Sequence, residues 1–147
     1  MGPVSQSYRW LDITANPAPD LILPPLQSQP MFARWFTPMD KAGFRWLCFD
    51  RTTKRGPHNR LFIDANGNGR LDDEQPVSGR GGAYDTTFES VRLVFQTDDG
   101  PVAYHLMVRC LVSDRDREPP RTYVRPSCWY EGTVDFAGKK HRLRLLD

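Results

Sequence analysis

Residues 102–112 read VAYHLMVRCLV, and this stretch decides the fold class. Apolar side chains occupy alternate positions, whereas His105 and Arg109 fall between them. A period of two is typical of a β-strand with one buried face. The residues predicted to share that face are Val102, Tyr104, Leu106, Val108, Cys110 and Val112. Residues 90–96 can pair with this strand across the turn at 97–100, so the pattern predicts a β-hairpin.

Two further hairpins follow from the same reasoning. Residues 43–50 pair with 60–63 around a turn that contains Gly56-Pro57, and residues 128–136 pair with 141–146 across 137–140. In the last hairpin we expect four side chains to face the core: Val134, Phe136, Leu143 and Leu145. No sustained helical period accompanies these strands. The sequence therefore predicts an all-β fold, an antiparallel β-sandwich built from hairpins, with a partly open β-barrel as the alternative.

The N-terminal part of the chain is rich in proline. Six of the 13 prolines lie between residues 14 and 38, which excludes helix there. Apolar residues are interspersed among them, namely Leu21, Ile22, Leu23 and Leu26. We therefore expect residues 1–40 to form an extended arm that packs on a β domain at 41–147.

Residues 61–74 read LFIDANGNGRLDDE, a short strand that opens into a D-x-N-x-N-G loop. Calcium prefers six to eight oxygen ligands at about 2.3–2.6 Å, and alternate residues of a curled loop supply them. The predicted loop spans residues 64–75, and the predicted ligands are Asp64, Asn66, Asn68, the carbonyl of Arg70, Asp72, Asp73 and Glu74. Gln75 stands where a bidentate acid is expected, so Asp73 or Glu74 would complete the shell. A pair of overlapping Asn-Gly turns without metal is the alternative.

This spacing resembles the calcium loops of EF-hand, dockerin and thrombospondin-type proteins. Pro76 disfavours a helix directly after the loop, so the loop is not part of an EF-hand helix pair. A later W-Y-x-G-x-V-x-x-x-G-K-K hairpin starts at Trp129. Together, residues 60–74 and 128–147 resemble poorly characterised bacterial exported β-rich proteins. The resemblance implies a calcium-loop β architecture and no established activity.

Composition restricts the partners and the compartment. A net charge of +2 without a basic cluster argues against nucleic acid, and no apolar run approaches the roughly 20 residues of a membrane span. The three cysteines, Cys48, Cys110 and Cys128, lie in apolar segments, which favours buried free thiols over one disulfide with a leftover cysteine. Weak calcium loops are filled where calcium is abundant, so we expect an extracellular or periplasmic location.

These observations favour a non-enzymatic, calcium-stabilised β domain that acts as a structural, adhesion or ligand-binding module. Its expected partners are calcium and either other domains of a longer chain or a glycan. One alternative is a carbohydrate-binding module that uses exposed aromatics among Trp10, Trp35, Trp46 and Trp129. The other is a hydrolase assembled from loops.

Two more specific expectations concern Asp64 and Asp147. A loop at the surface should tolerate Asp64→Ala, which would remove calcium stabilisation without unfolding the protein. Residues 141–147 approach their aspartate much as 58–64 approach Asp64. This similarity favours a natural chain that continues past Asp147 into another such loop, and the alternative is that any two amphipathic strands ending in aspartate look this similar.

Overall fold

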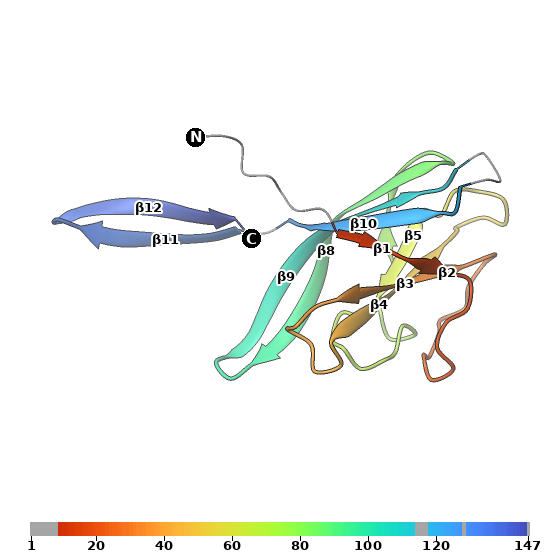
Figure 1. The fold of residues 1–147 in the computed structure, drawn as a ribbon, viewed down its shortest axis with the longest axis horizontal. Helices are drawn as coiled ribbons and strands as arrows, with labels where there is room; N and C mark the ends of the chain where they lie inside the picture. Colours follow the sequence, from red (N-terminus) through yellow and green to blue (C-terminus); the bar gives the residue numbers. More distant parts are fainter. Residues whose placement is uncertain (1–8, 114–117, 128, 147) are drawn as a thin grey trace.

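The computed structural model of the protein describes residues 9–113, 118–127 and 129–146. In these ranges, twelve strands form three antiparallel sheets (Figure 1). The first sheet has the order β1 (Arg9–Leu11), β10 (Arg121–Pro126), β9 (Gly100–Leu111), β8 (Asp85–Thr97) and β7 (Arg80–Gly81). The second has the order β2 (Ile13–Thr14), β3 (Met31–Phe36), β4 (Phe44–Asp50), β5 (Arg60–Ile63) and β6 (Val77–Ser78). The third contains only β11 (Trp129–Phe136) and β12 (Lys139–Leu146).

The main core lies between the two five-stranded sheets. Phe49 of β4 packs on Phe88 of β8 with ring centroids 5.9 Å apart, and Trp35 of β3 stacks on Tyr104 of β9 at 6.1 Å. The alternating residues predicted for 102–112 are buried from Tyr104 to Cys110. The all-β sandwich is confirmed, and the strands in the described ranges do not close into a barrel.

The outer face of the second sheet is also covered. Phe32, Cys48 and Phe62 lie side by side on β3, β4 and β5, and they pack with Leu21 and Leu71. Leu23, Leu26 and Trp46 pack against this cluster, whereas Ile22 is exposed. Because both faces of β4 are buried, its sequence is almost continuously apolar rather than alternating.

A β-bulge in β8 explains why this strand is longer than the sequence predicted. The register shifts between Phe88 and Val91, and Ser90 adopts a positive φ of 55°. An inserted residue in a strand reverses the facing of all residues beyond it, and here the bulge keeps both Phe88 and Val91 in the core.

The third hairpin forms as predicted, but the prediction that its apolar side chains face the core is wrong. Val134, Phe136 and Leu143 are exposed. The physical reason is that β11 and β12 pair with each other and with neither five-stranded sheet. In Figure 1 the hairpin extends away from the sandwich. The side chain of Leu145 lies outside the described part of the structure.

Both edges of the sandwich are formed by segments that change sheets. β1 and β2 are separated only by Asp12, yet β1 pairs with β10 and β2 pairs with β3. On the other side, β6 and β7 are separated only by Gly79, and they pair with β5 and β8. Such crossing segments join the two sheets at their corners.

Gly79→Ala should lower the free energy of unfolding by about 1–3 kcal/mol, the usual cost of overpacking. A Cβ at this position would clash with Cγ2 of Thr86 and would lie 2.7 Å from Cε1 of the buried Phe88. Gly82→Ala is the matched control, because a Cβ there has no atom within 4 Å. Urea unfolding of both variants checks the prediction, and equal midpoints would contradict it.

Candidate metal centre

The 64–75 loop connects β5 to β6, and backbone hydrogen bonds fix its start to both sheets. The N–H of Asp64 donates to the carbonyl of Trp46 on β4 at 3.0 Å. The N–H of Val94 on β8 donates to the carbonyl of Ala65 at 2.8 Å. The first two residues of the loop are therefore held in the rigid part of the molecule.

Asp64 is the centre of the loop and is buried, with 4% of its surface exposed. Its carboxylate accepts hydrogen bonds from three backbone N–H groups. Oδ1 accepts from Gly67 at 2.7 Å and from Asn68 at 3.0 Å, and Oδ2 accepts from Gly69 at 2.9 Å. Gly67 and Gly69 have φ values of +78° and +74°, so the loop curls through a conformation that favours glycine. The loop lies at the surface, as expected, with Asn66 and Asn68 exposed, but Asp64 is buried beneath it, so the reason for expecting Asp64→Ala to be tolerated does not hold.

The two asparagines place their side-chain oxygens along the same curl. Oδ1 of Asn66 accepts the N–H of Asn68 at 3.0 Å, and Oδ1 of Asn68 accepts the N–H of Arg70 at 2.9 Å. Nδ2 of Asn68 donates to Oδ2 of Asp73 at 2.8 Å, which brings the two ends of the loop together. Each amide oxygen can accept a second bond, so each still has a lone pair for a cation.

The acidic residues at the end of the loop make two different kinds of contact. Asp72 forms an ion pair with the guanidinium of Arg70 at 2.7 Å, so its charge is balanced locally. Glu74 instead points back to the start of the loop, where Oε1 accepts the N–H of Ala65 at 2.7 Å. Burial raises the pKa of Glu74, and the nearby carboxylates of Asp73 and Asp64 raise it further, although backbone N–H groups oppose them. Asp73 and Asp64 are thus near enough to Glu74 to act on its charge.

The proline-rich segment anchors the far side of the loop. The N–H of Ile22 donates to the carbonyl of Gly69 at 3.2 Å, and the N–H of Leu71 donates to the carbonyl of Ile22 at 2.8 Å. Leu71 is fully buried in the outer cluster. In the described ranges the carbonyl of Arg70, between these two bonds, accepts no hydrogen bond.

Arg45 is the residue beside the loop that the sequence reasoning missed. It is buried on β4, where it forms an ion pair with Asp40. It donates to the carbonyls of Asp64 and Val94, both at 3.0 Å, and its guanidinium lies 4.5 Å from the ring centroid of Phe95. The only sequence signal for a buried Arg45 was an arginine in an otherwise apolar strand. Strands with one exposed face show the same pattern, so the signal did not distinguish a buried arginine from an exposed one.

The fit of these groups to a metal rests mainly on neutral oxygens. Among the described residues, no three His, Cys, Asp or Glu side chains form a group that could hold a metal ion. The oxygen set offered by the loop instead combines the Asp64 carboxylate with Asn66, Asn68, the Arg70 carbonyl and either Asp73 or Glu74. This all-oxygen set suits a hard cation such as calcium and does not suit zinc.

The two thiols within the described ranges are unsuited to nucleophilic chemistry. Cys48 and Cys110 are free and buried, on β4 and β9 respectively, as the sequence favoured. Burial raises the pKa of each thiol to about 12, so both stay protonated near neutral pH. Cys128 lies outside the described residues.

Comparison of the chain with protein-family models, with curated proteins and with solved structures finds no match. No helix in the described ranges is long and apolar enough to cross a bilayer. Any functional assignment therefore rests on the geometry of the chain's own residues.

Proposed function

We propose that the 64–75 loop binds calcium and that the chain is a non-catalytic β domain which this ion stabilises. The observation that carries the proposal is the buried Asp64 carboxylate, with the loop backbone curled around it and Asn66 and Asn68 on the same curl. A cation at this place would be held by oxygens from both ends of the loop.

Electrostatics favours a bound cation over a metal-free turn. An Asn-Gly turn needs no acid at position 64 and none at 73 or 74. Here Asp64 and Asp73 both raise the pKa of Glu74, which means that the ionised carboxylates repel one another. A divalent ion would remove this repulsion.

The role that follows is mechanical. The loop connects the end of β5, a strand of the second sheet, with the proline-rich segment that covers the outer cluster. Fixing the loop would stiffen this face of the sandwich, as a structural, adhesion or ligand-binding module requires. Because weak calcium sites fill only where calcium is abundant, the proposal includes an extracellular or periplasmic location.

Calcium should raise the melting temperature of the protein relative to EDTA. An ion that binds only the native state at a hundredfold excess over Kd adds about 2.7 kcal/mol of stability. For a chain of this length, that corresponds to a rise of several degrees. Scanning calorimetry in calcium, in magnesium and in EDTA checks it. Identical curves in calcium and EDTA would reject the calcium proposal.

Glu74→Gln should reduce the calcium response while sparing the metal-free fold. Glutamine can still accept the N–H of Ala65, but it removes the repulsion from Asp73 and Asp64. With its pKa raised in the folded state, Glu74 contributes most stability below the ordinary glutamate value of about 4.3 and loses that contribution as pH rises through the raised value.

In EDTA the variant should therefore gain stability relative to the wild type as pH increases from about 4 to about 7. Urea unfolding across this range measures the gain, and Asp99→Asn in the exposed 97–100 turn is the control. If Glu74→Gln kept the full calcium shift and the wild-type pH profile, Glu74 would have no part in the site.

A further inference from the structure

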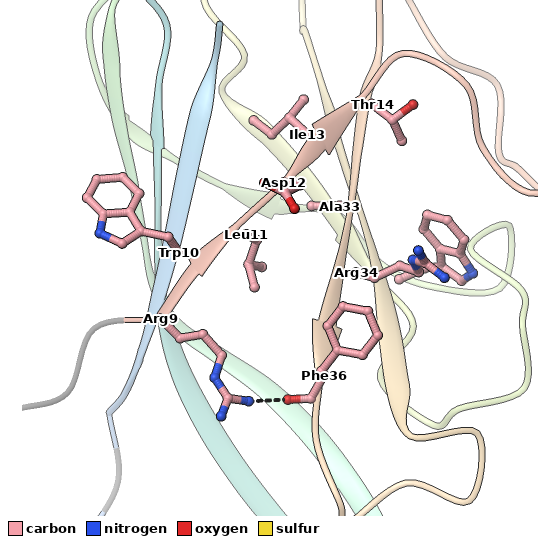
Figure 2. Close-up of a pocket in the computed structure, with 10 residues that line it drawn as sticks. Arg9, Trp10, Leu11, Asp12, Ile13, Thr14, Ala33, Arg34 and Phe36 are labelled. Carbon is pink, nitrogen blue, oxygen red and sulfur yellow. Dashed lines mark hydrogen bonds between the residues drawn. The ribbon is translucent and has the colours of Figure 1, made fainter.

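A groove runs along the corner where the chain passes from the first sheet to the second (Figure 2). Its volume is about 410 Å³, within the range of roughly 300–1,000 Å³ typical of ligand pockets. β1 and β2 form one wall and β3 forms the other, while Asp12 lies on the connection between β1 and β2. The groove is separate from the 64–75 loop, whose residues do not line it.

Arg34 projects from β3 into an aromatic environment. Its guanidinium carbon lies 5.3 Å from the ring centroid of Phe36, 5.4 Å from that of Phe44 and 5.7 Å from that of Trp46. These cation–π contacts restrict the guanidinium but use none of its N–H donors. Arg34 is exposed, and among the described residues it has no carboxylate partner. A fixed, unpaired guanidinium is suited to bidentate recognition of a carboxylate.

Two aromatic rings on this surface each contact another ring and are still about half exposed. Phe36 is 51% exposed, although it packs on Phe44, and Nη1 of the Arg9 guanidinium donates to the backbone carbonyl of Phe36 at 2.6 Å. Trp10 is 56% exposed, although it makes an edge contact with Tyr123. In Figure 2 the Trp10 ring lies on the opposite side of β1 from Phe36. The two rings therefore provide separate flat, apolar surfaces for the face of a sugar ring.

Two more depressions adjoin the groove and extend it. Trp10 and Asp12 also line a depression of about 380 Å³ that includes Arg121, and Arg9 and Phe36 also line one of about 350 Å³. In the described residues, the three depressions together are lined by three arginines, Arg9, Arg34 and Arg121, and by one acid, Asp12. The surface is thus extended, aromatic and predominantly positive.

We propose that this groove binds an acidic saccharide, with the carboxylate of a hexuronate on the guanidinium of Arg34 and the adjoining sugar face on Phe36. Asp12, whose side chain makes no hydrogen bond or ion pair within the described part of the chain, accepts from sugar hydroxyls. The neighbouring depressions take the next sugar units, toward Trp10 and Arg121. A neutral glycan would not use the arginines, and a simple inorganic anion would not use the rings.

The test is calorimetric titration of the protein with an oligogalacturonate, carried out in EDTA. The chelator separates this site from the calcium loop, because saturable binding in EDTA does not depend on that loop. Arg34→Gln should weaken binding by about tenfold to a hundredfold, the usual effect of losing hydrogen bonds to a charged group. Phe36→Leu should weaken it several-fold. Arg92→Gln, the same change at an exposed arginine outside the groove, should have no effect.

Several results would overturn the proposal. These are an absence of saturable binding by the wild type, equal affinity in the Arg34→Gln variant with an unchanged melting curve, or equal affinity for a neutral oligosaccharide of the same length. Competition by acetate or phosphate at the same concentration as the saccharide would show a simple anion site. Equal affinity for a short single-stranded DNA would show general polyanion binding.

Discussion

Arg45→Met should lower the free energy of unfolding by about 3–5 kcal/mol, the cost of breaking a buried ion pair by removing one partner. Arg45 and Asp40 have side-chain exposures of 3% and 8%. Methionine fills a similar volume, but it leaves the carboxylate of Asp40 without its cation. It also leaves the carbonyls of Asp64 and Val94 without their donor.

Urea unfolding followed by tryptophan fluorescence measures this loss. Arg92→Met is the control, because Arg92 is an exposed arginine on β8. The double variant with Asp40→Asn should be less destabilised than the sum of the two single variants, since the uncompensated charge is removed. A loss below 1 kcal/mol for Arg45→Met would show that water replaces the arginine at little cost.

Asp64→Ala should destabilise the protein by about 3–4 kcal/mol even in EDTA. Hydrogen bonds to a charged group contribute about 1.5–3 kcal/mol each, and loss of the carboxylate leaves three backbone N–H groups without an acceptor, a cost that water entering the loop partly offsets. This replaces the sequence-based expectation of a tolerated change, because the carboxylate is inside the protein.

The measurement is again equilibrium unfolding, in EDTA and in calcium. Asp98→Ala, at an exposed position of the 97–100 turn, removes the same group without structural cost and serves as the control. The calcium-induced shift should disappear in Asp64→Ala and persist in Asp98→Ala. An Asp64→Ala protein as stable as the wild type would mean that the loop does not depend on its central carboxylate.

Period and turn chemistry were sufficient to predict the fold class and its three hairpins. The alternation at 102–112 and the turn at 97–100 predicted β9 and its pairing with β8. The bulge at Ser90 could not be predicted, because serine is not a residue type that indicates a positive φ. The bulge is required only by the packing of both Phe88 and Val91 in the core. For the same reason, an amphipathic pattern identified β11 and β12 as strands but could not show what their apolar face contacts.

The sequence predicted the residues of the candidate site but not the contacts that hold the loop in place. The D-x-N-x-N-G spacing identified the curl around Asp64, because each hydrogen bond there joins near neighbours. The contacts that fix the curl come from distant parts of the chain, Ile22 on one side and Arg45 on the other. Such contacts depend on how the sheets stack, which no local pattern contains. The proposed saccharide groove belongs to the same class, since its walls combine residues 9–14 with Ala33, Arg34, Phe36 and Trp46.

Because β1 pairs with β10, the first sheet cannot be completed until residues 121–126 have been synthesised. The register joins Arg9 to Val124, so the early segment must wait for a strand made much later. β3, β4 and β5 are consecutive and can pair as soon as they are synthesised. The order of assembly should therefore run from the β3–β5 meander, which β2 can join, to the β8–β10 meander, with residues 9–11 docking last. The proposed saccharide groove, whose wall they help to form, would then be the last surface to appear, and only the fully folded protein would display it.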